Sequence, residues 1–310
     1  MKTISIVMPC YNEELNVEKA YNAVKEVFSG LGNYEYEHIF IDNASEDSTF
    51  SILKNIAGRD KRVKLIRNVR NFGHIRSPYY GLLQASGDAV VLMVSDLQDP
   101  PGMIADFVRK WEAGHKIVVG VKTHSDESPL MFQVRKFYYG LMNRISEVRH
   151  IENFTGFGLY DREVIDILRK IEDPYPYFRG LIADIGFEIA GVEYVQPARK
   201  RGITKNNLYT LYDMAMLGLT NYSKIPLRVA TFLGFTMSLA SLFVAFVYML
   251  YKLVYWNKFS VGMAPLVIGL FFLFSIQLFF LGIIGEYVGS IHTKVLKRPL
   301  VIERERVNFQ

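Results

Sequence analysis

Residues 1–225 alternate between short apolar runs and longer segments in which apolar residues recur at helical spacing. Short apolar runs bounded by turn-forming residues are typical of buried strands, and recurrence every three or four residues is typical of amphipathic helices. This order predicts an α/β domain with a doubly wound, mostly parallel sheet. The expected strands are Ile4–Met8, Tyr36–Ile41, Val63–Ile66, Ala89–Val94 and Lys116–Gly120, and the expected helices are Glu13–Phe28, Asp47–Ala57, Ile75–Ala85 and Gly102–Ala113.

Two later segments have a different pattern, because residues 229–251 and 263–285 contain no charged side chain. A helix that crosses a bilayer needs about 20 such residues, so both segments are predicted to be transmembrane helices. Basic residues are more numerous on the flanks of this helix pair than in the loop that connects the two helices. This distribution predicts a multi-pass protein of the inner (cytoplasmic) membrane with both termini cytoplasmic. The flanks carry Lys205, Lys224, Arg228, Lys294, Lys297, Arg298, Arg304 and Arg306, and the connecting loop carries Lys252 and Lys258.

These patterns divide the chain into a soluble domain, an interfacial helix, a membrane hairpin and a tail. The interfacial helix is expected because an apolar-rich segment directly precedes the first membrane helix. The soluble domain ends in a helical segment, 128–150, and a mixed segment, 151–205. The predicted divisions are 1–205 for the soluble domain, 206–228 for the interfacial, juxtamembrane helix, 229–289 for the two-helix hairpin and 290–310 for a basic cytoplasmic tail.

Composition excludes several classes of protein. Of the 310 residues, 50% are hydrophobic and 22% are charged, which excludes an intrinsically disordered chain. The single cysteine, Cys10, excludes a disulfide framework and a cysteine zinc cage. The formal net charge is +5, and we attribute it to the basic residues that flank the membrane hairpin and face anionic lipid headgroups. No nucleic-acid motif accompanies this charge, so we expect no nucleic-acid partner.

Polar clusters follow three of the predicted strands. They are residues 9–14, 42–49 and 95–101. An Asp after a strand is often only the N-cap of the next helix. However, ligands of doubly wound sheets bind beyond the carboxyl ends of the strands, where one crevice would collect all three clusters. Three clusters at successive strand ends therefore favour a binding site.

The residue types in these clusters suit a nucleoside diphosphate. A buried Asp can accept a hydrogen bond from a ring N–H of the base, and Tyr11 can pack on the plane of the base. Asp96 and Gln98 offer oxygen ligands to a hard cation, Mg²⁺ or Mn²⁺, that bridges phosphates. No glycine-rich dinucleotide fingerprint follows the first strand and no Walker loop is present, so a dinucleotide cofactor is not expected.

The chain resembles the family-2 glycosyltransferases with a GT-A fold. More closely, it is similar to the polyisoprenyl-phosphate glycosyltransferases, which include bactoprenol glucosyltransferases and dolichol-phosphate mannosyltransferases. The resemblance spans essentially the whole chain, and its most specific parts are the segment SDLQDPP and the terminal GEYVGSI with KRPL. The matching segments are MPCYNEE, FIDNASEDST, RNFGHIR, ASGDAVVLMVSDLQDPP, GFGLYDRE, GITK, KIPLR and GIIGEYVGSI with KRPL.

The resemblance implies a role for individual residues. For each basic residue the alternative is a solvated cation on the surface. The implied nucleotide-binding residues are Pro9, Tyr11, Glu13 and Asp42; the metal ligands are Asp96 and Gln98; the phosphate-binding residues are Lys122, Arg135, Arg201 and Lys205; and the catalytic residues are Asp96, Arg201 and Lys205.

The implied reaction moves a sugar, with inversion, from a nucleoside-diphosphate sugar to polyprenyl phosphate at the cytoplasmic membrane face. UDP is favoured over GDP by the closer resemblance to the bacterial enzymes, but Asp42 could accept from either base. The sugar and the oligomeric state, a homo-oligomer included, stay open.

The chain departs from the family pattern at Val94, Gly156 and Gly102, where relatives usually carry acids. Val94 and Gly156 motivate the alternative of a catalytically impaired, sugar-nucleotide-binding membrane scaffold. A processive polysaccharide synthase is a further alternative, but such enzymes generally need more membrane helices and a QxxRW-type segment, which the chain lacks.

Overall fold

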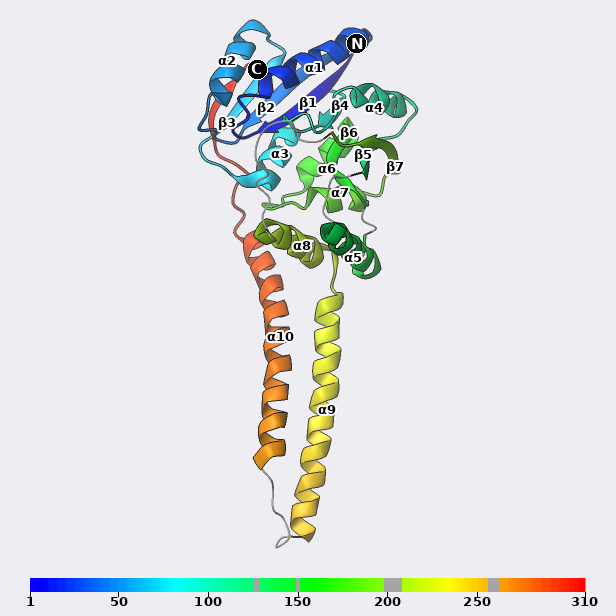
Figure 1. Ribbon diagram of the computed structural model, residues 1–310, viewed down its shortest axis with the longest axis vertical. Coiled ribbons are helices and arrows are strands. Elements are labelled where there is room, and N and C mark those ends of the chain that lie inside the picture. The colour runs from blue at the N-terminus through cyan, green and yellow to red at the C-terminus, as the bar shows by residue number, and fades with distance from the viewer. Residues whose placement is uncertain (125–128, 149–150, 198–207, 256–262, 310) are drawn as a thin grey trace.

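The computed structural model describes residues 1–124, 129–148, 151–197, 208–255 and 263–309 (Figure 1). An α/β domain stands at one end of the molecule, and two long helices project from it. The strands are β1 (Lys2–Cys10), β2 (Tyr34–Asp42), β3 (Val63–Asn68), β4 (Ala89–Leu92), β5 (Ile117–His124), β6 (Phe154–Asp161), β7 (Ile189–Val195) and β8 (Glu303–Val307). The helices are α1 (Val17–Gly30), α2 (Thr49–Arg59), α3 (Gly73–Leu83), α4 (Met103–Glu112), α5 (Pro129–Ile145), α6 (Arg162–Lys170), α7 (Phe178–Asp184), α8 (Leu208–Tyr222), α9 (Ile225–Val254) and α10 (Met263–Val295).

The strands form one sheet in the order β7-β5-β6-β4-β1-β2-β3-β8. The central strands β4, β1, β2 and β3 are parallel, as are β5 and β7. The predicted α/β class with a mostly parallel sheet is therefore confirmed. Because β4, β1 and β2 are adjacent and parallel, their carboxyl ends lie at the same edge of the sheet, where ligands of such folds bind.

The central strands bury both of their faces. Ile4, Ile6 and Met8 of β1 lie in an apolar core with side chains of α1, α2 and α4. Val7, which points to the opposite face, lies in a second core with Ile39 and with side chains of α3 and α6. Burial on both faces explains why these strands are continuous apolar runs in the sequence.

Three strands were not predicted: β7, which pairs parallel with β5, and β6 and β8, which are each antiparallel to a neighbour. β6, within the segment 151–205, pairs antiparallel with β4 and β5. β8 pairs antiparallel with β3, so the segment 290–310 is not a separate tail but returns to complete the sheet. The β8 sequence, ERERV, is almost entirely charged, as suits an exposed edge strand, and therefore gives no hydrophobic signal.

Two element boundaries differ from the prediction for local reasons. α1 begins at Val17 instead of Glu13, because the amides of Asn16 and Val17 both donate to the Glu13 carbonyl and form a turn. β4 ends at Leu92 instead of Val94, because the Val94 amide donates to the carboxylate of Asp99, 3.1 Å away, rather than to a neighbouring strand.

Two helices lie between the sheet and the long helices. Figure 1 shows α5 and α8 between the sheet and the pair formed by α9 and α10. The segments Ile225–Val254 and Ile268–Val295 have mean hydropathies of 2.0 and 2.3, and the most apolar stretch of each contains no buried residue. Both are long and apolar enough to cross a membrane, as the sequence predicted.

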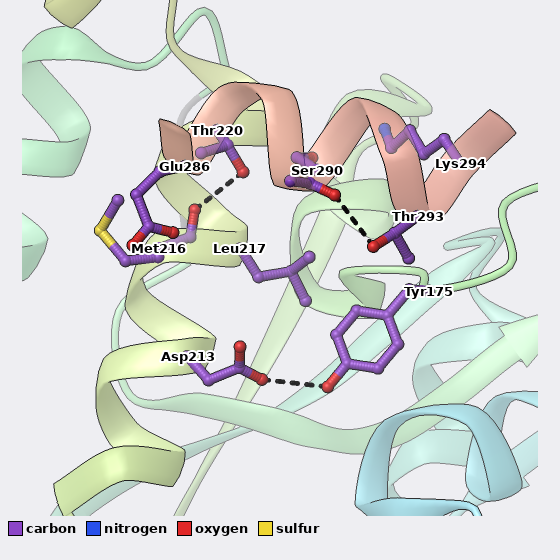
Figure 2. Close-up of a pocket in the computed structure, with 10 residues that line it drawn as sticks. Tyr175, Asp213, Met216, Leu217, Thr220, Glu286, Ser290, Thr293 and Lys294 are labelled. Atoms are coloured by element: carbon purple, nitrogen blue, oxygen red, sulfur yellow. Dashed lines mark hydrogen bonds between the residues drawn. The ribbon is translucent and has the colours of Figure 1, made fainter. Parts of the chain in front are cut away.

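Hydrogen bonds fasten α8 on both sides. The hydroxyl of Tyr175, in the α/β domain, donates to Oδ2 of Asp213 on α8 at 3.1 Å (Figure 2). The hydroxyl of Tyr212, also on α8, donates to Oε1 of Glu286 on α10 at 2.8 Å. A small cavity of about 150 Å³ lies at this junction. α8 therefore connects the soluble domain to the apolar helices.

Candidate active site at the carboxyl ends of the central strands

A cavity of about 380 Å³ opens at the carboxyl ends of β1 and β4. Four of the residues singled out in the sequence line it: Pro9, Asp96, Gln98 and Lys122. They come from β1, from the loop after β4 and from β5, so the topology gathers side chains that are far apart in the chain. Its volume is in the range of pockets that hold small molecules.

Tyr11, Glu13 and Asp42 lie outside this cavity lining, at the neighbouring ends of β1 and β2. Asp42 is 1% exposed, and its Oδ1 accepts from the amide and the hydroxyl of Ser45, at 3.1 and 2.5 Å. Burial raises the pKa of Asp42, and the hydrogen bonds from Ser45 and the charge of Arg67 act against that rise. The sequence-based site is thus split into two adjacent parts.

Reciprocal hydrogen bonds join the loops that follow β1 and β2. The Asn12 amide donates to the Ser45 hydroxyl at 2.9 Å, and the Asn12 side chain accepts from the Glu46 amide at 2.9 Å. The Glu13 amide donates to the Thr49 hydroxyl at 2.8 Å. These bonds hold Asp42 beside the end of β1. Because β1 lies between β4 and β2 in the sheet, Asp42 is separated from the loop after β4.

Left-handed backbone conformations mark the same loops. Asn12 follows β1, Ala44 follows β2 and Leu97 follows β4, with φ angles of 57°, 63° and 61°. Residues other than Gly adopt such angles at a cost, and strain of this kind concentrates at binding sites. The conformation of each loop is therefore imposed by the surrounding hydrogen bonds rather than by its own preference.

We expect Ala44→Gly to stabilise the protein by up to about 1 kcal/mol, because Gly adopts the left-handed conformation without the clash of Cβ. Ala105→Gly, within the right-handed helix α4, is the matched control and should destabilise by about the same amount. The apparent unfolding temperatures of the purified variants test both signs. A lower unfolding temperature for Ala44→Gly would contradict the assignment of strain.

The loop after β4 separates the roles of its two acids. Asp99 is buried, and its carboxylate accepts from the Val94 amide at 3.1 Å and from the Tyr194 hydroxyl at 3.2 Å. Burial raises the pKa of Asp99 to about 6. Asp96 is half-buried, lines the cavity and accepts from the Gln98 amide at 3.1 Å. Both acids line the cavity, but Asp99 is buried and held by hydrogen bonds that shape the loop, whereas Asp96 is half-buried.

The donor set at this loop fits a divalent cation shared with a phosphate ligand. Asp96 offers a carboxylate and Gln98 an amide oxygen, and both line the cavity. Within the described residues, no group of three His, Cys, Asp or Glu side chains forms a complete cage. Mg²⁺ often binds through one or two carboxylates and takes its other ligands from water and substrate phosphates. These residues therefore suit a cation that is completed by a diphosphate.

The two departures from the family pattern that line the cavity have clear structural settings. Val94 is 38% exposed on the cavity wall and offers no ligand atom. Gly156 has φ +105°, and an added Cβ would contact Phe178 at 3.6 Å. Space for a Cβ is therefore available, but the positive φ would strain any side chain at Gly156 in this backbone.

Several cavity residues had no signal in the sequence. His74 of α3, Arg179 of α7 and Met214 of α8 also line this cavity. His74 Nε2 lies 3.3 Å from the Met214 sulfur, and Arg179 donates to the Tyr139 hydroxyl at 3.2 Å. Partial burial and the positive charge of Arg179 lower the pKa of His74.

The structure describes the side chain of only one of the four predicted phosphate-binding residues. Lys122 donates to the Gln196 side chain at 2.7 Å and lines the cavity. Arg135 belongs to α5, and only its backbone is described. Arg201 and Lys205 lie outside the described residues, which omit 198–207.

The parallel-centred sheet, the acidic loop after β4 and the cavity at its carboxyl edge agree with the GT-A fold that the sequence predicts. The family model for glycosyl transferase family 2 matches residues 5–168. The chain is 36% identical over 301 residues to the SfII prophage-derived bactoprenol glucosyl transferase of Shigella flexneri, covering 96% of each chain. It is 34% identical over 307 residues to the uncharacterized glycosyltransferase YkcC of Bacillus subtilis, covering 99% of this chain and 94% of that one. The chain belongs to glycosyl transferase family 2 and is a glycosyltransferase.

A solved structure supports the fold alone. The crystal structure of a mycobacterial protein superimposes with a TM-score of 0.50 at 21% identity, over 71% of this chain and 73% of that chain. This superposition covers 71% of the chain, whereas the two sequence relatives above match 96% and 99% of it.

Proposed function

We propose that the protein transfers a sugar from a nucleoside-diphosphate sugar, with UDP favoured, to polyprenyl phosphate at a membrane surface. One observation carries the proposal: the cavity lined by Asp96 and Gln98 also reaches Met214 of α8, the helix that connects the soluble domain to the apolar pair. A lipid acceptor can therefore meet a donor bound at the sheet. The bactoprenol glucosyl transferase relative supports this acceptor class.

The donor would lie along the sheet edge. Its base would meet Asp42 and Tyr11 beyond β2 and β1, with Pro9 and Glu13 near the ribose, and its diphosphate would meet Asp96 and Gln98. Neighbouring strands lie about 5 Å apart, so the path from β2 across β1 to β4 is about 10 Å, which a nucleoside diphosphate spans. The order β4-β1-β2 in the sheet supports this placement.

The reaction needs little acid–base chemistry from the protein. The second pKa of a phosphomonoester is about 6, so the lipid phosphate is mostly dianionic at neutral pH and is already a nucleophile. One of its oxygens forms a bond to the anomeric carbon while the bond from that carbon to the nucleotide diphosphate breaks, and the electron pair leaves with the nucleoside diphosphate. Attack opposite the leaving group inverts the anomeric centre.

Catalysis then consists of positioning and of stabilising the leaving group. A divalent cation, Mg²⁺ or Mn²⁺, held by Asp96 and Gln98 would supply positive charge to the departing diphosphate. Lys122 lines the same cavity, and Arg135, Arg201 and Lys205 are proposed to meet the donor or acceptor phosphates. The absence of an acid at Gly156 does not impede a nucleophile that needs no base.

We expect the nucleotide-free protein to bind Mn²⁺ weakly and the complex with a nucleoside diphosphate to bind it much more tightly, because Val94 removes one carboxylate from the ligand set. Val94→Asp should tighten Mn²⁺ binding to the free protein. Val69→Asp, at another exposed valine, is the matched control and should not. Paramagnetic relaxation with and without UDP measures these affinities. Equal, tight binding in both states, or full activity in excess chelator, would contradict the proposal.

The long helices would form a hairpin with both chain termini on the cytoplasmic side. The basic residues outside the hairpin support this topology. The return of β8 to the sheet supports it as well, because the chain that follows α10 then lies on the same side as the chain that precedes α9. The donor, a cytosolic metabolite class, is available on that side.

The proposal is tested with the purified full chain, polyprenyl phosphate and a panel of labelled UDP- and GDP-sugars. We expect label from one UDP-sugar in the extractable lipid. Donor binding without any lipid product would favour the alternative that Val94 and Gly156 motivate, a sugar-nucleotide-binding membrane scaffold.

A further inference from the structure

The segment GEYVGSI, residues 285–291, lies where α10 passes α8 (Figure 2). Glu286 is the first charged residue after the uncharged stretch 263–285. Its Oε1 accepts the hydrogen bond from the Tyr212 hydroxyl of α8 at 2.8 Å. Glu286 therefore holds α8 at the point where the apolar part of α10 ends.

Tyr287, the next residue, holds the turn that follows α8. It is 7% exposed, and its hydroxyl donates to the Ser223 carbonyl at 2.6 Å. Ser223 lies between α8 and α9, and its own hydroxyl donates to the carbonyl of Ile145, the last residue of α5, at 2.7 Å. The Glu147 amide donates at 2.8 Å to the carbonyl of Tyr222, the last residue of α8. Tyr287 therefore joins α10 to the ends of both α8 and α5.

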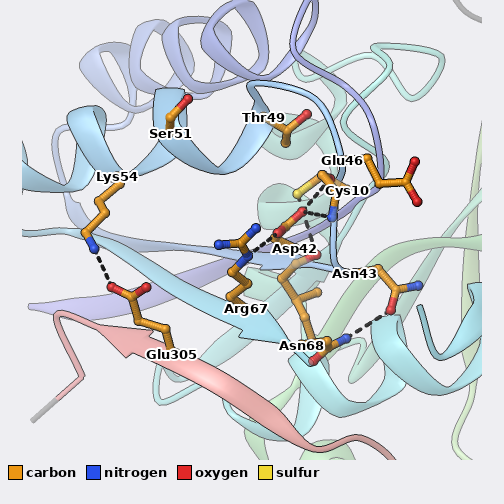
Figure 3. Close-up of polar contacts among 12 residues, drawn as sticks. Cys10, Asp42, Asn43, Glu46, Thr49, Ser51, Lys54, Arg67, Asn68 and Glu305 are labelled. Carbon is orange, nitrogen blue, oxygen red and sulfur yellow. Dashed lines mark hydrogen bonds and ion pairs between the residues drawn. The ribbon is translucent and has the colours of Figure 1, made fainter. Parts of the chain in front are cut away.

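α10 is itself anchored to the α/β domain. The chain that follows it returns as β8, which pairs with β3. Glu305 of β8 also forms an ion pair with Lys54 of α2 at 2.5 Å (Figure 3). Because α10 is anchored to the sheet in this way, the contacts of Glu286 and Tyr287 hold α8 and α5 at a defined position relative to the strand ends.

α8 supplies one residue of the cavity, and α5 contacts another. Met214 of α8 lines the cavity and lies two residues from Tyr212, about 3 Å along the helix axis. Tyr139 of α5 accepts a hydrogen bond at 3.2 Å from Arg179, which also lines the cavity. Asp96, in contrast, accepts a hydrogen bond from within its own loop. A displacement of α8 or α5 would therefore disturb Met214 and Arg179 and leave the loop after β4 in place.

From these contacts we infer that Glu286 and Tyr287 are positioning residues for the lipid acceptor: they hold α8 and α5 so that the cavity admits the phosphate of polyprenyl phosphate. This inference rests on the proposed function. Neither residue is among the described residues that line the cavity, so both act through α8 and α5 rather than on the reacting atoms. The expected signature of their loss is a higher KM for the acceptor with an unchanged affinity for the donor nucleotide.

Tyr287→Phe tests the buried contact. Initial rates of lipid glycosylation by the purified full chain are measured over a range of polyprenyl phosphate concentrations at saturating UDP-sugar. The KM for polyprenyl phosphate should rise about two- to tenfold, because one buried hydrogen bond is lost while the ring stays in place. Calorimetric titration with UDP should give the affinity of the unaltered protein, which also shows that the α/β domain of the variant is folded.

Glu286 is tested by removal and by rescue. Glu286→Ala and Tyr212→Phe should each raise the acceptor KM about two- to tenfold. The double variant should be no worse than Glu286→Ala, since both changes remove the same hydrogen bond. Glu286→Gln keeps a side-chain oxygen that accepts from Tyr212, so it should restore most of the loss.

Glu112→Ala is the matched control for Glu286→Ala. The Glu112 carboxylate also accepts from a tyrosine hydroxyl, that of Tyr34 at 2.6 Å. Tyr34 begins β2 and therefore lies at the opposite end of the sheet from the cavity. Glu112→Ala should leave the acceptor KM unchanged.

Specific outcomes would overturn the inference. Parallel losses of UDP affinity and acceptor KM in Tyr287→Phe would show a structural role only. Glu286→Gln as impaired as Glu286→Ala would show that the hydrogen bond to Tyr212 is not what positions α8. An unchanged acceptor KM in Tyr287→Phe and Tyr212→Phe, with lipid product formed by the unaltered protein, would refute this inference and leave the proposed function standing. If the unaltered protein forms no lipid product, the proposed function fails and this inference fails with it.

Discussion

Asp96→Asn is expected to lower kcat by about two to three orders of magnitude, because it removes the carboxylate that would hold the cation at the leaving diphosphate, a contribution of several kcal/mol. Both acids of the loop line the cavity, but Asp96 is half-buried, whereas Asp99 is buried and accepts hydrogen bonds from Val94 and Tyr194. The initial rate of lipid glycosylation at saturating donor and acceptor measures the effect.

Asp106→Asn is the matched control for this prediction. Asp106 is an aspartate on the neighbouring helix α4 that pairs with Arg109 on the surface. Its replacement should leave kcat unchanged. Unchanged turnover in Asp96→Asn, with a folded protein, would remove Asp96 from the mechanism.

Asp42→Ala is expected to weaken donor binding by about 1–3 kcal/mol, or about five- to 150-fold, because Arg67 and the base N–H both lose their buried partner. The change should appear mainly in the KM for the donor, since Asp42 lies outside the cavity that holds the reacting groups. Calorimetric titration with UDP measures the same loss without turnover.

Asp60→Ala is the control for Asp42→Ala, because Asp60 likewise pairs with an arginine, Arg62, but before the start of β3. It should leave the donor KM unchanged. Identical UDP affinity in Asp42→Ala and the unaltered protein would show that Asp42 is only a turn residue held by Ser45.

The central sheet could be predicted because burial on both faces turns its parallel strands into continuous apolar runs. Ile4–Met8 and Ala89–Val94 are such runs, and both correspond to strands of the structure. β8 could not be predicted, because its ERERV sequence is stabilised by pairing with β3 and by the Asn308 side chain, which donates to the carbonyls of Ala57 and Val63. Neither contact produces a pattern of hydrophobic and polar residues in the sequence of β8.

From the sequence, the site could be predicted only where polar residues directly follow a strand. Polar clusters after β1, β2 and β4 indicated a crevice, and Pro9, Asp96 and Gln98 do line one cavity. The placement of Asp42 outside that cavity depends on hydrogen bonds between two loops, which no spacing encodes. His74 and Arg179 reach the cavity through tertiary packing of α3 and α7, so their contribution required the structure.

The helices α8, α9 and α10 were likewise predictable only in part. The absence of charge predicted α9 and α10, whereas the hydrogen bonds of Tyr175 and Tyr212 that fasten α8 between the soluble domain and α10 join segments distant in the chain. These contacts hold α8, whose Met214 lines the cavity.

The most direct test of the account compares polyprenyl phosphate with the matched polyprenol as acceptor, using purified full chain, a labelled UDP-sugar and mass spectrometry of the extracted lipid. The account predicts a lipid that carries one phosphate and one sugar, formed from the phosphate acceptor alone, with one UDP released for each sugar transferred. Transfer to the alcohol, or release of free sugar without a lipid product, would contradict it.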